Sequence, residues 1–191
     1  TSVMAYKDMG YLPEAIINYL VRLGWSHGDQ EIFTIDELIR EFSLEAVGKS
    51  AAVFNPDKLL WLNQHYIMSY AEERLIEAML PFWRERGYDT SDHGYLRKLT
   101  AELRPRAKTL VEMADSGAFY FTQEVAYDPA AAAQFLTAEY AGHLEAVAQG
   151  LPGLADYTKD GIEAFLRALA EQRGTKLKWV AQTVRVALTG R

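Results

Sequence analysis

The sequence predicts an all-α protein, and three observations support that prediction. Apolar side chains recur at helical spacing along nearly the whole chain. Prolines and small polar residues occur where helices would begin, and glycines where they would end. Strand-like alternation is confined to a weak stretch at Phe119–Thr122. The chain has 191 residues, of which 49% are hydrophobic and 24% charged, so we expect one or two ordinary folded domains.

The helices expected in the first third of the chain begin at identifiable caps. Pro13 suits the first turn of a helix that Gly24 would end. Thr34-Ile-Asp-Glu37 has the spacing of a capping box, in which each end of the motif satisfies a backbone N–H of the other. Asn55 followed by Pro56 predicts another helix start, with the asparagine as the cap.

The later helices are expected from amphipathic spacing and from breaker residues. A run over 71–86 would end at Gly87, and a run over about 91–104 would end where Pro105 removes a backbone donor. Asp128-Pro129 would open an alanine-rich helix. The last two helices are expected over 160–172 and 177–188, and composition suggests three units, at 1–70, 71–121 and 122–191.

The sequence contains no recognisable catalytic or metal-binding pattern. It has no cysteine, which excludes disulfides and thiolate metal sites and fits a reducing cytoplasm. Its four histidines lack metal-ligand spacing, and neither a Gly-rich phosphate loop nor a Gly-x-Ser-x-Gly elbow occurs. The sequence contains no run of 18 apolar residues, so it predicts no membrane-spanning helix, and its first residues do not resemble a secretory signal. Thr1 in place of an initiator Met suggests that the chain was cut from a longer one.

The positive charges are unevenly distributed. The formal net charge is −6, which taken alone disfavours nucleic acid as a partner. Yet half of the 20 Lys and Arg residues fall in two stretches, 97–108 with one acid and 173–191 with none. Two basic patches on an acidic protein favour oriented docking on phosphates, although such runs are more often solvated helix faces.

Two basic features have a geometry that suits RNA. In the last expected helix Lys178, Gln182 and Arg185 share one face, opposite an apolar face formed by Leu177, Val180, Val184, Ala187 and Leu188. In Arg104-Pro105-Arg106 the proline fixes the backbone, so a flanking guanidinium can address a base from a defined corner. The alternative for this corner is a helix end whose cations offset the helix dipole.

The opening segment resembles a known family. The run from Asp8 to Asp29, DMGYLPEAIINYLVRLGWSHGD, resembles the segment after the lysine signature loop of bacterial glutamyl-tRNA synthetases. The stretches EIF at 31–33, FNPDKLLWLN at 54–63 and HYI at 65–67 follow in the same order. Near the end, KL at 176–177 and VAQTVRVALTG at 180–190 resemble the family's C-terminal motif.

The resemblance implies a function for the parent protein and a division of labour within it. The family joins glutamate to tRNA-Glu using ATP, through a glutamyl-adenylate. Its ATP and Mg sites lie in a catalytic domain that we expect to precede this chain. The chain would then hold a stem-contact region over 1–70 and most of a helical-bundle anticodon-binding portion, truncated at its C-terminal end. We therefore expect the fragment alone to be inactive in aminoacylation.

The resemblance also indicates six tRNA-binding residues. Ser26, Lys58 and Trp61 match positions that touch the tRNA near the inside of its L, although Trp61 could instead be a core residue. Lys98 replaces a basic contact conservatively, whereas Met68 occupies a position where the family can have an arginine. The two anticodon-reading candidates are Arg106, which matches an arginine that recognises the third base, and Arg185, in a motif altered from Gln-Pro-Leu-Arg to Gln-Thr-Val-Arg.

Two alternatives remain open at this point. The chain could be a helical protein-interaction module, since helical bundles bind partner helices in apolar grooves and synthetases can gather auxiliary proteins. It could also come from a non-discriminating synthetase that charges tRNA-Gln as well. The preferred partner is tRNA-Glu in the cytoplasm, with neither a membrane nor DNA as a partner.

Overall fold

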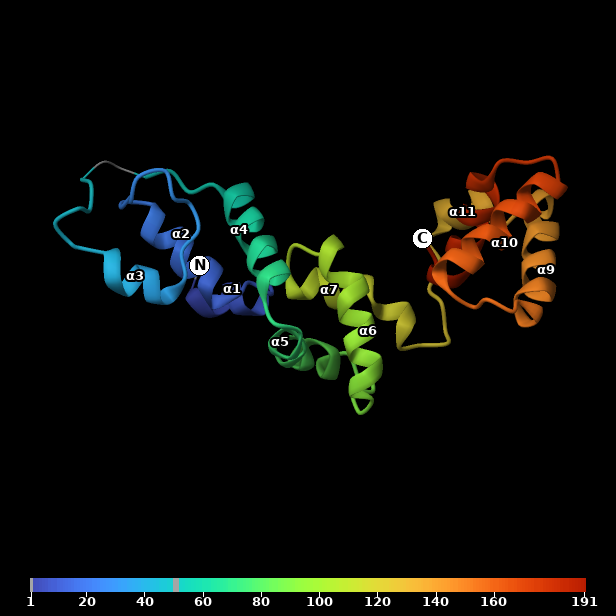
Figure 1. The fold of residues 1–191 in the computed structure, drawn as a ribbon, viewed down its shortest axis with the longest axis horizontal. Coiled ribbons are helices and arrows are strands. Elements are labelled where there is room, and N and C mark those ends of the chain that lie inside the picture. Colours follow the sequence, from blue (N-terminus) through green and yellow to red (C-terminus); the bar gives the residue numbers. More distant parts are fainter. Residues whose placement is uncertain (1, 50–51) are drawn as a thin grey trace. The chain divides into compact units, whose positions relative to one another are not determined.

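The computed structural model describes residues 2–49 and 52–191, and it confirms the all-α prediction. In the described residues the only strand-type pairing is an isolated bridge between His27 and Gln30. No helix there is long and apolar enough to cross a bilayer. The α-helices (Figure 1) are α1 Val3–Asp8, α2 Pro13–Arg22, α3 Ile35–Glu41, α4 Pro56–Ser69, α5 Glu72–Glu85, α6 His93–Leu103, α7 Leu110–Ser116, α8 Pro129–Phe135, α9 Ala138–Gly150, α10 Lys159–Gln172 and α11 Leu177–Thr189. The described residues also form the 3₁₀ turns η1 Arg104–Arg106, η2 Ala118–Tyr120 and η3 Leu151–Gly153.

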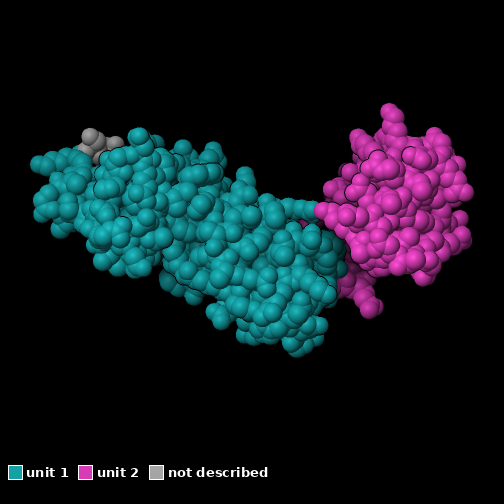
Figure 2. Space-filling model, in the orientation of Figure 1, with its two compact units in different colours: residues 1–121 teal, residues 122–191 magenta. Residues whose placement is uncertain are grey.

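The chain divides into two compact units, residues 1–121 and 122–191 (Figure 2). The first unit has a core to which α2, α4, α5, α6 and α7 all contribute buried side chains. That core includes side chains on both sides of residue 70, for example Ile67 and Leu75. The proposed boundary between a stem-contact region and a first anticodon-binding unit stays a prediction.

The caps expected from the sequence are present. The hydroxyl of Thr34 accepts a hydrogen bond from the backbone N–H of Glu37 at 3.2 Å, and the Glu37 carboxylate accepts one from Thr34 at 2.7 Å. The side chain of Asn55 accepts from the N–H of Lys58 at 3.1 Å. Pro13 is the first residue of its helix, as expected. These helix starts follow from local chemistry, which explains why sequence alone predicts them.

One sequence expectation differs from the structure, and two helices have features that the sequence analysis did not address. The weak strand signal at Phe119–Thr122 is wrong, because this stretch begins in the 3₁₀ turn η2. The alanine-rich helix breaks after Phe135, and the break lets Phe135 and Tyr140 both contact the Trp179 ring, at centroid distances of 6.2 and 5.9 Å. Pro81 lies inside α5 without ending it. Tertiary contacts outweigh local propensity at such points.

A buried asparagine connects three segments of the first unit. The side chain of Asn63, on α4, is fully buried. Its oxygen accepts a hydrogen bond from the N–H of Leu12 at 2.8 Å, and its nitrogen donates to the carbonyls of Lys108 at 2.7 Å and Gly10 at 3.3 Å. Leaving this buried amide without partners would cost about 1–3 kcal/mol of folding stability, so the fold retains all of these bonds. They hold the turn before α2 and the segment before α7 against α4.

Gly10 makes the closest approach within this arrangement. Its φ is +83°, and a Cβ there would lie 2.5 Å from the backbone nitrogen of Val111 and 2.7 Å from that of Leu110. The carbonyl of Gly10 accepts a hydrogen bond from the N–H of Leu110 at 2.9 Å. Only glycine allows both the left-handed backbone and this contact with the start of α7.

A second polar network lies beside α2. The oxygen of Asn18 accepts a hydrogen bond from the N–H of Phe33 at 2.8 Å, and its nitrogen donates to the carbonyl of Glu31 at 2.9 Å. The hydroxyl of Tyr66 is 3.0 Å from the Asn18 oxygen and 2.8 Å from the Phe33 carbonyl. Burial raises the pKa of Tyr66 to about 12. This network holds the loop that follows α2 against α4.

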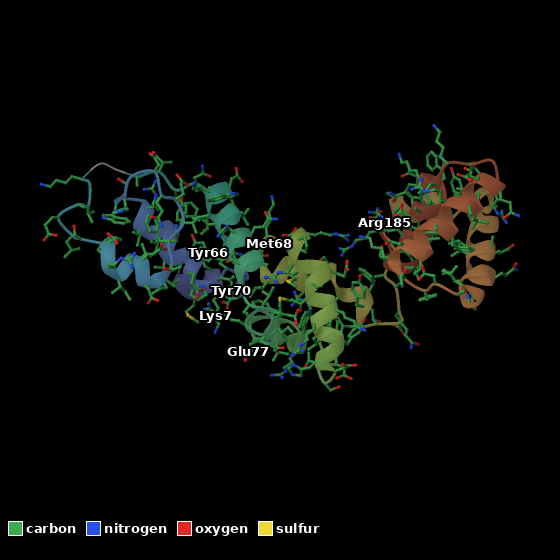
Figure 3. The ribbon with its side chains drawn as sticks, viewed as in Figure 1. Lys7, Tyr66, Met68, Tyr70, Glu77 and Arg185 are labelled. Atoms are coloured by element: carbon green, nitrogen blue, oxygen red, sulfur yellow. The ribbon has the colours of Figure 1, made fainter. Side chains whose placement is uncertain are left out.

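Glu14, Tyr70 and Arg74 form an ion-pair cluster at the start of α2. The Glu14 carboxylate accepts hydrogen bonds from the Tyr70 hydroxyl and the Arg74 guanidinium, and that guanidinium lies 4.0 Å from the Tyr70 ring centroid. Burial alone would raise the pKa of Glu14, but the hydrogen bonds outweigh it and the pKa falls below its ordinary 4.5. Burial and Glu14 together raise the pKa of Tyr70 well above 10. Tyr70 follows the last residue of α4 (Figure 3).

The second unit is built around α11, which contacts α8, α9 and α10. Its buried face consists of Val180, Thr183 and Val186. The expected apolar face was partly wrong, since Leu188 is 62% exposed. The small core of this unit comprises Val147, Leu169, Ala170 and Val180.

The two ends of the second unit are joined by hydrogen bonds. The N–H of Asp128 donates to the carbonyl of Gly190 at 2.8 Å, and the Tyr127 hydroxyl donates to the carbonyl of Ala187 at 3.0 Å. The end of α11 is thereby fixed to the start of α8.

Gly10→Ala should destabilise the chain much more than Gly28→Ala. Gly28 also has positive φ, +53°, but nothing lies within 4 Å of an added Cβ. The control should therefore cost only the backbone strain, about 1–2 kcal/mol, whereas Gly10→Ala also displaces the backbone of α7 and should cost at least about 3 kcal/mol. Urea unfolding measures both free energies. Equal losses would show that the approach to α7 is unimportant.

Glu14→Gln should flatten the acid dependence of stability. A carboxylate whose pKa is lowered by folding contributes stability above the unfolded-state pKa, and that stability is lost as pH falls through the folded-state pKa. The free energy of unfolding of the wild type should therefore fall more steeply below pH 4.5 than that of the variant. Tyr70→Phe should give an intermediate slope, and identical slopes for all three proteins would contradict the assignment.

Candidate nucleic-acid interface

The two arginines of the Arg104-Pro105-Arg106 corner have different roles in the structure. The guanidinium of Arg104 donates to the carbonyls of Ile67 and Met68 at 2.8 Å and of Tyr70 at 2.7 Å. It thus satisfies carbonyls at the end of α4 that have no partner within the helix. A cation at a helix C-terminus is also favoured by the helix dipole. Arg104 is therefore a structural residue.

Arg106 is exposed, and among the described residues its side chain makes no hydrogen bond or ion pair. The backbone on both sides of it is nevertheless fixed. Arg104 is held at the end of α4, Ala107 is fully buried, and the carbonyl of Lys108 is bonded to Asn63. The structure thus presents a guanidinium to solvent from a rigid corner, which is the arrangement required to address one base.

Lys58 and Trp61 come together on one face of α4. The Lys58 ammonium lies 4.5 Å from the centroid of the Trp61 ring, and it forms an ion pair with Glu31. The Trp61 side chain is 45% exposed, so it is not a core residue. A ring with an adjacent cation offers both a stacking surface and a phosphate ligand.

Ser26 lies in an adjoining hollow. It is exposed and lines a shallow pocket with Arg22, Gly24 and Trp25. Arg22 also lines the neighbouring cleft that contains Lys58. The structure therefore brings three of the predicted residues, Ser26, Lys58 and Trp61, to one region of the first unit.

Lys98 is exposed on α6, and among the described residues its side chain has no ion pair. Its neighbour Arg97 is paired with Glu73 and lies 3.5 Å from Glu72. Because Arg97 and Arg104 are both engaged within the protein, the basic stretch 97–108 offers fewer solvent-directed cations than the sequence suggests.

Arg185 lies in the second unit, exposed on α11 (Figure 3). Lys178, two turns earlier, has its ammonium 5.4 Å from the Trp179 ring centroid. The altered motif does not interrupt the helix, since α11 begins at Leu177 and the hydroxyl of Thr183 donates to the carbonyl of Trp179 at 2.8 Å. The basic face of α11 is therefore present despite the threonine.

Sequence reasoning missed two charged residues near Lys58. Arg22 and Glu31 face the same cleft, and Glu31 pairs with both Lys58 and Arg22. Arg22, Glu31 and Lys58 belong to no sequence motif that would reveal these contacts. Among the described residues, no group of three His, Cys, Asp or Glu side chains could hold a metal ion.

Comparison with known families gives these surfaces a context. A family profile described as an anticodon binding domain matches residues 74–191. The chain belongs to this family of anticodon-binding domains. A second profile, described as the catalytic domain of class I tRNA synthetases (E and Q), matches residues 1–61 and so extends into the region around Lys58.

Similar proteins confirm the resemblance to glutamyl-tRNA synthetases. The chain is 64% identical over its whole length to glutamate–tRNA ligase 1 of Syntrophus aciditrophicus and 51% identical to glutamate–tRNA ligase of Geobacter sulfurreducens. It covers 40% and 41% of these two proteins, so this anticodon-binding family member spans about two fifths of their length. A crystal structure of a glutamate tRNA ligase from Elizabethkingia meningosepticum superposes with a TM-score of 0.84 at 29% identity, over 97% of this chain and 37% of that one.

Arg104→Met and Arg106→Met should separate the two roles at the corner. Loss of the Arg104 guanidinium leaves three carbonyls without their charged donor, which should lower the free energy of unfolding by about 1.5–3 kcal/mol. Arg106→Met should change it by no more than about 0.5 kcal/mol, as expected for an exposed side chain without partners. Urea unfolding of both variants measures the difference. A destabilising Arg106→Met would mean that this arginine is structural too.

Proposed function

We propose that this chain binds tRNA-Glu as the stem-contacting and anticodon-reading part of a glutamate–tRNA ligase. In this proposal the longer protein joins glutamate to the tRNA in the cytoplasm, using ATP and Mg bound outside this chain, and the chain alone does not aminoacylate. Three observations support it: the family match, the similarity to glutamate–tRNA ligases along the whole of this chain, and the exposed cations on both units.

The observation that most directly supports anticodon reading is the guanidinium of Arg106 on its fixed corner, which has no partner in the described part of the chain. A guanidinium has only donors. On its pairing edge cytosine presents two adjacent acceptors, O2 and N3, whereas guanine presents one acceptor, O6, beside two N–H groups whose hydrogens a guanidinium cannot accept. An arginine at this corner therefore favours cytosine as the third anticodon base, which distinguishes glutamate from glutamine tRNAs.

The charge distribution supports an oriented and salt-sensitive complex. The net charge of −6 repels RNA from most of the surface, while Lys58, Lys98, Arg106 and Arg185 attract phosphates or bases locally. Binding should therefore weaken as salt rises, because each neutralised phosphate releases counterions.

Arg106→Gln should reduce discrimination at the third anticodon base. Two tRNA transcripts that differ only by cytosine or guanine at that base would be titrated against wild type and variant by filter binding. The wild type should prefer the cytosine transcript, and the variant should lose about 1–3 kcal/mol of that preference, because glutamine can both donate and accept.

Lys108→Gln is the matched control, since it removes one nearby exposed cation without touching the proposed base reader. It should weaken the binding of both transcripts equally and reduce the salt dependence of that binding. An unchanged preference in Arg106→Gln would reject the assignment of this arginine, and absence of salt-sensitive binding to either transcript would reject tRNA binding itself.

A further inference from the structure

We infer that Glu31 occupies a phosphate-binding site of the first unit and competes with RNA for its two cations. The site is a cleft of about 210 Å³ between α2 and α4, with Arg22, Glu31 and Lys58 among its lining residues. We call it the Glu31 cleft. The inference rests on the proposed function, which it deepens by assigning the ligand and the residue that controls access to it.

The first argument is the arrangement of charges. The two oxygens of the Glu31 carboxylate each contact one cation: Oε1 lies 3.5 Å from Nη2 of Arg22, and Oε2 pairs with the Lys58 ammonium. A carboxylate between two cations holds the place that a phosphodiester oxygen pair would take, because both present anionic acceptors with similar spacing. The same cations can therefore bind RNA phosphate once the carboxylate is displaced.

The second argument is that each of the three charged residues of the cleft also has contacts outside the charged group. The backbone carbonyl of Glu31 accepts a hydrogen bond from the buried Asn18 at 2.9 Å. Arg22 donates to the carbonyl of Trp25 at 3.5 Å. Lys58 lies over the Trp61 ring and near the start of α4, which Asn55 caps. Because the cations do not depend on Glu31 for their location, they remain in place when its charge is removed.

The third argument is accessibility. The side chains of Arg22, Lys58 and Glu31 are 23%, 39% and 43% exposed, so RNA can reach the two cations without unfolding any element. An ion pair this exposed is worth little, about 0.2–1 kcal/mol, and a phosphate can displace it. Glu31 thus lowers the affinity for any phosphate while leaving the site usable for an RNA held by other contacts.

The test compares Glu31→Gln with Glu41→Gln in the full chain. Glu41 is matched to Glu31, since it also lies in the first unit and also forms an exposed ion pair, with Arg40. Both changes reduce the net negative charge equally. The probes are a tRNA-Glu transcript and an unrelated tRNA, titrated by filter binding over a series of salt concentrations.

Glu31→Gln should bind both tRNAs about two- to fivefold more tightly than Glu41→Gln does, the range expected for releasing a partly exposed ion pair. Its salt dependence should also be steeper, because additional cations reach phosphates. The gain should be equal for the two tRNAs, since phosphates have no sequence. In a Lys58→Met background, Glu31→Gln should produce only a small part of this gain in affinity.

Several results would overturn the inference. Equal affinities for the two glutamine variants, weaker binding by Glu31→Gln, or a full gain without Lys58 would each reject a competing carboxylate while leaving the proposed function standing. Binding of neither tRNA by the wild type or Glu31→Gln would reject both. If thermal melting shows that Glu31→Gln does not fold, Glu31→Asp replaces it, because the shorter side chain moves the carboxylate away from the cations but keeps its charge. Glu31→Asp should show a smaller gain in tRNA affinity. No gain would equally reject the inference.

Discussion

The amide of Asn63 is the interaction on which the first unit most depends. It is buried at the middle of α4 and bonds backbone groups of Gly10 and Leu12, in the turn before α2, and of Lys108, which is distant from them in the sequence. Leu12 precedes α2, and Lys108 follows the corner that presents Arg106. One side chain thus fixes both the opening segment and the corner, so a chain that failed to bury this amide would lose its candidate base reader as well as its core.

The second constraint is how the cations are shared between structure and solvent. A count along the sequence treats all of the basic residues in 97–108 as equivalent. In the structure Arg97 is paired with acids and Arg104 is committed to the end of α4, whereas Lys98 and Arg106 face solvent without partners among the described residues. Net charge and charge runs therefore describe attraction at long range, while recognition depends on which cations the fold leaves unused.

Sequence predicted the parts of the fold that local chemistry determines. The capping box at Thr34 and the Asn55 cap need only residues three positions away, and the opening segment identified the family. The contact of Phe135 with the Trp179 ring joins helices that are distant in the sequence, and the role of Arg104 depends on carbonyls more than 30 residues away. Spacing cannot reveal such contacts, and for the same reason it could not associate Glu31 with Lys58. The tRNA contacts of the six chosen residues stay predictions.

The hydrogen bonds between the start and the end of the second unit bear on how it can open. Asp128 precedes α8 and Gly190 follows α11, so the Asp128–Gly190 and Tyr127–Ala187 bonds connect these two helices. Local unfolding of α11 must therefore also release the start of α8. The exposed basic side chains of α11 are thus carried by a helix that cannot fray by itself.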